Sequence, residues 1–285
     1  MLQQLDTFVG PEVGWFALSP MLTLLGGTLV LMLAGALTPQ WPKGLYAFAT
    51  ATIAGAAGVL AMVQWDDITD NGTRTLVGGA IAYDTLSMFV TITICVAVIL
   101  VALLSDDYLR GTPNDGPEVY ALYMVAAIGG IVMASANDLI VLFLGLETLS
   151  LALYVLASSN RRSSESAESG IKYFVLGGFA SAFFLYGIAL VYGATGSTNI
   201  SEMVAALQNG VDPFGNESLA LAGIALLIVG LGFKVASVPF HVWAPDVYQG
   251  APTPVTALMA SVGKAAAFAA MLRVLVIALP FYRDD

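Results

Sequence analysis

The stretch GFKVASVPFHVWAPDVYQGAPTPVTALMASVGKAAAF, residues 232–268, combines features that seldom occur together. Lys234 and Lys264 each stand in apolar sequence, and between them lies a proline-rich segment with the only histidine of the chain, His241. A lysine in an apolar run is costly if the run lies in a membrane, because the ammonium group leaves water. The meaning of the stretch therefore depends on whether its surroundings cross a bilayer.

The composition of the whole chain is that of a membrane protein. Of the 285 residues, 58% are hydrophobic and 11% are charged, and the mean hydropathy is +0.83. Soluble domains contain about 25% charged residues. The net charge of −10 comes from acids that lie mostly between apolar runs, and no basic stripe is present. These totals argue against a soluble fold and exclude a nucleic-acid partner.

Eight apolar runs are long enough for transmembrane helices, which need about 20 predominantly apolar residues each. We therefore expect an all-α, polytopic transmembrane helix bundle of about eight helices. The runs lie at 16–37, 44–64, 83–104, 118–136, 138–158, 170–193, 218–237 and 252–280. The connections 66–75, 105–118 and 158–169 are predicted to be loops. In the connection 194–217, Asn199 or Ser201 is expected to cap a short surface helix.

The distribution of basic residues predicts the orientation of the chain as a multi-pass protein of the cell membrane. Short cytoplasmic loops carry an excess of Lys and Arg. An external N-terminus places Lys43, Arg110, Arg161 and Arg162 in the cytoplasm, against Arg74 and Arg283 outside. No basic stretch precedes the first run, so we expect a retained span rather than a cleaved signal peptide.

Four basic residues lie inside predicted spans, Lys172, Lys234, Lys264 and Arg273, and one acid, Glu147, lies in the middle of a span. One central charge costs about 2.5–3.5 kcal/mol on insertion scales, so such residues pair, face the interior or line a wet cavity. Glu147 and Lys264 lie near the centres of their runs and are expected to be functional. Lys172 is open to a second explanation, in which its side chain extends to the membrane surface. For Arg273 we favour the surface or a structural ion pair.

Prolines predict that the seventh span is broken. Pro239 lacks a backbone donor and disturbs the preceding turn, so the helix should kink or stop near residues 237–239. Irregular backbone at membrane depth persists only where it is buried in protein or faces water. Residues 239–251 are therefore either a hydrated proton site or a cytoplasmic loop in which His241 is solvated and inert.

A buried carboxylate and lysine form a switch when they can approach and separate. A nearby Glu147 would hold Lys234 protonated, and its withdrawal would favour release of the proton toward His241 or Lys264. Histidine is suited to such a relay because it exchanges protons near neutral pH.

Three segments resemble the antiporter-like membrane subunits of respiratory complex I, the proton-pumping NADH:quinone oxidoreductase. PFHVWAPDVYQGAPTPVTALMASVGK at 239–264 matches the most distinctive segment of that family, and PDVYQGAPTPV looks like its subunit N branch. GLETLSLALYVL at 145–156 and SAESGIKYFVLGGFASAFFLYG at 166–187 are similar to the family pattern around functional charges. The resemblance runs along nearly the whole chain.

The resemblance implies a role for each of five residues in proton transfer. Glu147 corresponds to the glutamate that pairs with the lysine of the broken seventh helix, here Lys234. Lys264 corresponds to the central lysine of the eighth helix, which receives protons along water chains. Lys172 corresponds to a sixth-helix lysine that modulates the pair, and His241 falls at a family histidine in the break, which would relay protons.

The resemblance also implies an organisation. Residues 1–115 would form three N-terminal transmembrane helices, and 116–285 the first of two inverted five-helix repeats, a half-channel open to the cytoplasm. The second repeat would be absent, and the chain alone would not be expected to pump. Its partners would be lipid and the other membrane subunits of complex I. Quinone, FMN and iron–sulfur clusters would belong to partner subunits, with no cofactor in this chain.

Two rival functions remain. One is a subunit of a multisubunit cation/proton antiporter or membrane-bound hydrogenase, which would use the same half-channel with another driving reaction. The other is a membrane scaffold whose buried charges only hold helices together.

Overall fold

The computed structural model describes residues 13–38, 42, 44–110, 116–208 and 217–278, and within them the chain is almost entirely helical. Two short strands, β1 (Arg74–Leu76) and β2 (Ile81–Tyr83), form an antiparallel hairpin. The helices are α1 (Ser19–Leu37), α2 (Leu45–Asn71), α3 (Thr85–Leu109), α4 (Pro117–Ser135), α5 (Leu139–Ala157), α6 (Ser164–Thr195), α7 (Ile200–Gln208), α8 (Glu217–Val235), α9 (Ala244–Gly250), α10 (Thr253–Leu258), the π-helical η1 (Met259–Gly263) and α11 (Lys264–Ala278).

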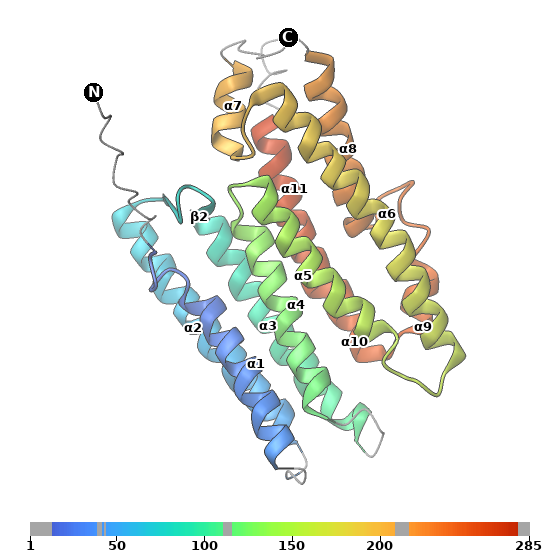
Figure 1. Cartoon of the computed structure of the whole chain (residues 1–285). Coiled ribbons are helices and arrows are strands. Elements are labelled where there is room, and N and C mark those ends of the chain that lie inside the picture. Colours follow the sequence, from blue (N-terminus) through green and yellow to red (C-terminus); the bar gives the residue numbers. More distant parts are fainter. Residues whose placement is uncertain (1–12, 39–41, 43, 111–115, 209–216, 279–285) are drawn as a thin grey trace, which may run out of the picture.

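Eight helical segments of the described ranges are long and apolar enough to cross a membrane, which confirms the expected bundle. They are α1 to α6, α8, and the continuous segment from α10 through η1 into α11. Figure 1 shows these segments running up and down side by side, with α7 at one end of the bundle and α9 at the other. Large apolar side chains on the outside, such as Leu33 on α1 and Phe179 on α6, suit a lipid environment.

Three helices extend into segments that were predicted to be loops. α2 continues to Asn71, α3 continues to Leu109, and α6 begins at Ser164. Polar residues support these extra turns: the Ser163 hydroxyl accepts a hydrogen bond from the amide of Ser166 at 3.1 Å and so caps α6. The loop predictions were wrong for residues 66–71, 105–109 and 164–169 and right for residues such as 158–163, because a helix ends where its capping groups end it, and not where the apolar sequence ends.

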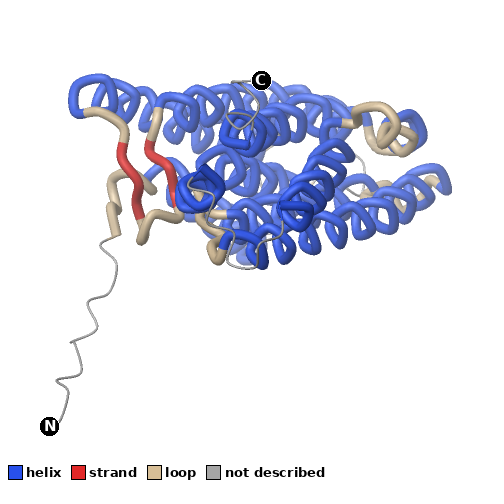
Figure 2. The backbone as a smooth tube through the Cα atoms, turned by 90° about the horizontal axis from the view of Figure 1, so that it is seen from above, coloured by secondary structure: helices blue, strands red, loops and turns tan. Residues whose placement is uncertain are grey.

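The hairpin of β1 and β2 was not predicted. Gly78 and Gly79 have φ of 64° and 86° and form its turn, in a conformation that glycine adopts readily. The carbonyl of Gly79 accepts hydrogen bonds from the side chains of Asn137, at 2.8 Å, and Asn199, at 2.9 Å. These bonds join the hairpin to the α4–α5 connection and to the start of α7. Figure 2 shows the strands at one edge of the bundle.

The short surface helix expected in 194–217 is α7. The side chain of Asn199 accepts hydrogen bonds from the amides of Ser201 and Glu202 at 3.1 and 3.2 Å, so Asn199 is the cap. Ile200 and Met203 are buried and attach the helix to the bundle. Lys43 and Arg283, used in the orientation argument, lie outside the described residues.

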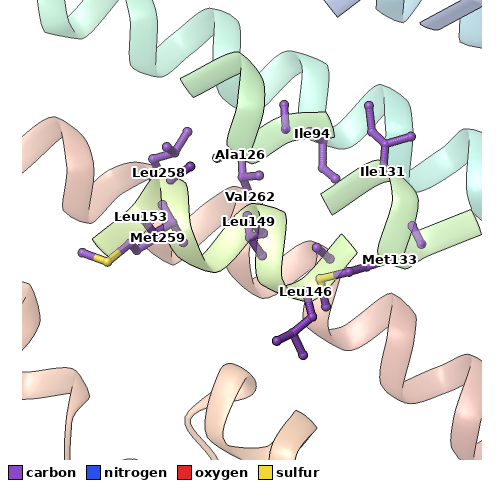
Figure 3. Packing of buried hydrophobic residues seen from close by; sticks show 14 of the residues in the cluster. Ile94, Ala126, Ile131, Met133, Leu146, Leu149, Leu153, Leu258, Met259 and Val262 are labelled. Carbon is purple, nitrogen blue, oxygen red and sulfur yellow. The ribbon is translucent and has the colours of Figure 1, made fainter. Parts of the chain in front are cut away.

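The hydrophobic core centres on α4, which contacts α1, α2, α3, α5 and α11. Figure 3 shows Ala126 of α4 meeting residues of α3, α5, α10 and η1, among them Leu149 and Val262. Small residues permit the closest approaches: a Cβ on Gly145 would lie 2.9 Å from the carbonyl oxygen of Gly129. Such small-residue contacts are typical of helices packed in a membrane.

Candidate proton-transfer site

The helix break lies between α8 and α10, as the prolines predict. α8 ends at Val235, and the next residue, Ala236, has φ of 61°, the left-handed conformation that often ends a helix. The proline-rich segment nevertheless contains a short helix, α9, which was not expected. Pro245 stands at its start, where the missing amide donor has no cost.

Lys264 completes the broken end of α8. Its Nζ donates hydrogen bonds to the carbonyls of Lys234, at 3.1 Å, and Val235, at 2.9 Å. The last carbonyls of a helix have no intrahelical partner, and the C-terminal end of the helix dipole attracts a cation. The indole Nε1 of Trp243 similarly donates to the carbonyl of Phe233 at 2.9 Å. The backbone of Lys234 is thus in direct contact with the half-buried ammonium of Lys264.

The side chain of Lys234 points into an aromatic cluster and is only 4% exposed. Its Nζ donates a hydrogen bond to the hydroxyl of Tyr173 at 3.2 Å. The same ammonium lies 5.0 Å from the ring centroid of Tyr173 and 5.4 Å from that of Tyr154. Attraction between a cation and an aromatic face is stronger at buried sites than at exposed ones, and this ammonium is buried. The expectation that Lys234 is buried is confirmed.

Glu147 lies half-buried on α5 and accepts a hydrogen bond from the hydroxyl of Ser181 on α6. The expected contact with Lys234 is not formed: the two residues, both in described helices, have no salt bridge within 4.0 Å. The structure therefore has the separated arrangement of the two, with the hydroxyl of Tyr173 and the ring of Tyr154 in contact with the ammonium in place of the carboxylate.

Lys172 lies apart from Glu147 and Lys234. Its Nζ is 2.7 Å from Oε1 of Glu168 and 2.6 Å from Oδ2 of Asp246, and its side chain is 40% exposed. The three residues line a cavity of about 200 Å³ at the junction of α6 and α9. The side chain therefore has the exposed position that the second explanation predicted, and it ties α6 to the helix in the break.

His241 is exposed in the turn between α8 and α9. An exposed side chain fits the alternative in which this part of the break is a solvated loop. It also leaves His241 outside the buried cluster around Lys234.

Arg273 forms the structural ion pair that was favoured for it. Its guanidinium donates to Asp84 at 2.8 and 2.9 Å, to the Ser87 hydroxyl at 2.7 Å, and to the carbonyl of Ala134. Burial raises the pKa of Asp84, but the hydrogen bonds and charge of Arg273 outweigh it and hold that pKa below its ordinary value. The cluster joins α11 to the start of α3 and the end of α4.

Sequence reasoning missed the aromatic residues of the site. The rings of Tyr154 and Tyr173 lie beside the ammonium of Lys234, and those of Trp243 and Tyr248 beside the ammonium of Lys264. A signal was available, since a tyrosine in an apolar span needs a partner for its hydroxyl. What could not be read from the sequence was that the partner of Tyr173 is Lys234, from another helix.

Comparison with known families covers the whole of this site. Residues 136–284 match the family model described as NADH:quinone oxidoreductase/Mrp antiporter, TM. The chain belongs to this family. All five predicted proton-transfer residues, Glu147, Lys172, Lys234, His241 and Lys264, lie within the matched segment.

Individual relatives agree with the family. The chain is 41% identical over 272 residues to NADH-quinone oxidoreductase subunit N 2 of Koribacter versatilis, covering 94% of this chain and 54% of that one. A chain of respiratory complex I from Thermus thermophilus with bound aureothin matches with a TM-score of 0.74 and 36% identity, over 89% of this chain and 52% of that one.

A second solved structure belongs to another enzyme. A chain of the membrane-bound sulfane sulfur reductase, an archaeal respiratory membrane complex, matches with a TM-score of 0.76 and 26% identity. The match covers 92% of this chain and 53% of that one. The chain spans about half the length of the curated relatives it matches.

Proposed function

We propose that this family member is a proton-translocating membrane subunit of a proton-pumping NADH:quinone oxidoreductase. The observation that carries the proposal is Lys234, buried at the broken end of α8, with the ammonium of Lys264 bound to its backbone carbonyl. A scaffold would pair such charges fully, because an unpaired buried ion is costly. The relatives named NADH-quinone oxidoreductase subunit N support the same assignment.

The proposed proton path joins the buried Lys234 to the half-buried Lys264. Lys234 takes up a proton from the side of the membrane at which the break and α9 lie, and passes it toward Lys264 through water near the aromatic cluster. Approach of Glu147 holds the proton on Lys234, and withdrawal releases it. His241 and Lys172 would act near the surface, His241 by exchanging protons with water and Lys172 by positioning α9 through Asp246.

The driving reaction would take place elsewhere. In this proposal quinone, FMN and iron–sulfur clusters belong to partner subunits, and this chain carries no redox chemistry. Other membrane subunits of the complex would be its direct partners. The end of the bundle with Arg161 and Arg162 would face the cytoplasm and the end with the hairpin the outside, consistent with the positive-inside rule.

A second candidate function is a subunit of a cation/proton antiporter or of another respiratory membrane complex. The match to the archaeal sulfane sulfur reductase favours it, as does the Mrp antiporter in the family description. The genes beside this one distinguish the two: genes for quinone-binding and NADH-oxidising subunits support the first proposal, and antiporter genes support the second.

Replacement of Lys234 by alanine tests proton translocation. In the assembled complex, Lys234→Ala should abolish proton pumping, measured by the quenching of a pH-sensitive dye in proteoliposomes, and leave the subunit content unchanged. Arg110→Ala, at an exposed salt bridge with Asp106, is the matched control and should pump normally. Full pumping by an assembled Lys234→Ala complex would refute the proposed mechanism.

A further inference from the structure

The ammonium of Lys234 has an unusual set of neighbours. Among the described residues its Nζ makes one hydrogen bond, to the hydroxyl of Tyr173, and it lies over the faces of Tyr154 and Tyr173. An ammonium has three protons to donate. The Tyr173 hydroxyl is therefore the only direct hydrogen-bond acceptor of this charge among the described side chains.

The Tyr173 hydroxyl is held in a defined place by packing on all sides. Tyr173 is fully buried, stacks on Trp243 with 4.7 Å between ring centroids, and meets Tyr154 edge-on at 4.8 Å. Trp243 is anchored by its hydrogen bond to Phe233. The next residue in the chain, Lys172, binds α9 through Asp246. Tyr173 therefore stands where α5, α6, α8 and the break meet.

The charged and polar groups around Lys234 differ in how closely they approach its ammonium. From α5, Glu147 lies beyond salt-bridge distance and Tyr154 presents its ring to the ammonium. From the start of α11, Lys264 brings a second cation, bound to the backbone carbonyls of Lys234 and Val235. From α6, Ser181 donates a hydrogen bond to Glu147, which occupies one of its oxygens. In the separated arrangement, Tyr173 is thus the one direct hydrogen-bond contact among the described residues that still favours the protonated lysine, and it does so more weakly than a carboxylate would.

We propose that Tyr173 is a positioning residue of the proton-transfer site, whose hydroxyl holds the ammonium of Lys234 away from Glu147 and sets the pH range over which Lys234 keeps its proton. The inference rests on the proposed function, because it requires Lys234 to carry a transferred proton. Tyr173 itself neither gains nor loses a proton.

The substitution Tyr173→Phe tests the proposal, since it keeps the ring and its stacking and removes only the hydroxyl. Lys234 then loses the acceptor that stabilises its charged form and releases its proton at lower pH. We expect the alkaline limb of the pumping-against-pH profile of the assembled complex to shift by about 1–2 pH units toward acid, the equivalent of one hydrogen bond to a charge. Pumping at the acid end of the profile should be retained.

The matched control is Tyr123→Phe. The hydroxyl of Tyr123 is also buried and hydrogen-bonds that of Ser105 at 3.0 Å, between α4 and α3, with no lysine involved. This variant should leave the pH profile unchanged. Equal shifts in both variants would mean a general effect of losing a buried hydroxyl and would overturn the proposal.

Three further outcomes of Tyr173→Phe would also overturn it. They are an unshifted pH profile, loss of pumping at every pH, and failure of the complex to assemble, which would make the hydroxyl a structural requirement. The result with Lys234→Ala separates this inference from the proposed function. If Lys234→Ala abolishes pumping and Tyr173→Phe leaves the pH profile in place, only the role of Tyr173 is refuted.

Discussion

Arg273 and Lys234 are both buried cations, and the free-energy cost of removing their charges from water is offset by different partners. Arg273 has four hydrogen bonds, including two to the carboxylate of Asp84. Among the described residues, Lys234 has one side-chain hydrogen bond, to the neutral hydroxyl of Tyr173, and its ammonium lies over two aromatic rings. A fully paired guanidinium cannot release its charge, whereas a lysine with few partners can lose a proton to restore neutrality. Burial alone therefore does not distinguish a structural charge from a candidate proton carrier. The hydrogen-bond partners of the charge make that distinction.

The two sites also differ in what they connect. Arg273 joins α11 to α3 and α4, next to the hairpin. Lys264 binds the carbonyl of Lys234 at the break between α8 and α9, on the side of the bundle away from the hairpin. Arg273 thus holds one end of α11 while Lys264, at its other end, contacts the break. This difference predicts which substitutions affect assembly and which affect transport.

The largest effect on stability is expected from Arg273→Ala. The substitution leaves the partly buried Asp84, whose side chain is 24% exposed, without its cation; breaking a fully buried ion pair in this way costs about 3–5 kcal/mol, which sets the upper limit here. The measurement is the thermal unfolding of the purified complex together with the yield of this subunit in it. Arg110→Ala removes an exposed pair and should cost less than about 1 kcal/mol. Unchanged assembly and melting in Arg273→Ala would show that the cluster is not structural.

A smaller and more local effect is expected from Lys264→Met. The carbonyls of Lys234 and Val235 lose their donor, so the end of α8 should open more easily. Hydrogen exchange at the amides of Ala236 and Ser237 should become about 10-fold faster or more, since charged hydrogen bonds contribute about 1.5–3 kcal/mol. Lys264→Gln keeps a donor and should exchange more slowly than Lys264→Met.

Pumping distinguishes a cap from a proton carrier in these two variants. Neither Met nor Gln can carry the proton, so both should stop pumping, while only Met should loosen the break. If Lys264→Gln pumped normally, Lys264 would be a helix cap and not a proton carrier.

The smallest effect is expected from Lys172→Gln. The ion pairs of Lys172 with Glu168 and Asp246 are exposed, and salt screens exposed charges over about 8–10 Å at physiological ionic strength. We expect a modest fall in pumping rate at low salt that disappears in high salt. Glu168→Gln, which leaves the contact with Asp246 in place, should have less effect. Complete loss of pumping in Lys172→Gln would place Lys172 in the proton path itself.

Much of the fold could be predicted because it depends on properties of single segments. The run at 118–136 is apolar and long enough to span, and the structure has α4 there. The hairpin could not be predicted, since its strands have three residues each and depend on Asn137 and Asn199 from distant connections. The ends of α2 and α3 were missed because apolar length does not report helix capping.

The candidate site also has a part that the sequence predicted and a part that it did not. Lys234 and Lys264 were found because an ammonium in an apolar run is costly wherever the helix lies. The partners of each cation were not found, because they depend on which helix faces meet. Glu147 was expected to contact Lys234, and the structure instead has the Tyr173 hydroxyl in contact with the lysine and Ser181 with the glutamate.

The sequence by itself determined that the described part of this protein is a bundle with eight helices long and apolar enough to cross a membrane, a break after Lys234, and buried charges that need a partner or a role. Hydropathy, proline geometry and the cost of burying charge act on each segment separately, so they can be read along the chain. Only the tertiary structure decided that Arg273 is locked to Asp84 while Lys234 rests on Tyr173 and Tyr154. Pairing is a property of packed helices, and in a uniformly apolar sequence many packings satisfy the same pattern.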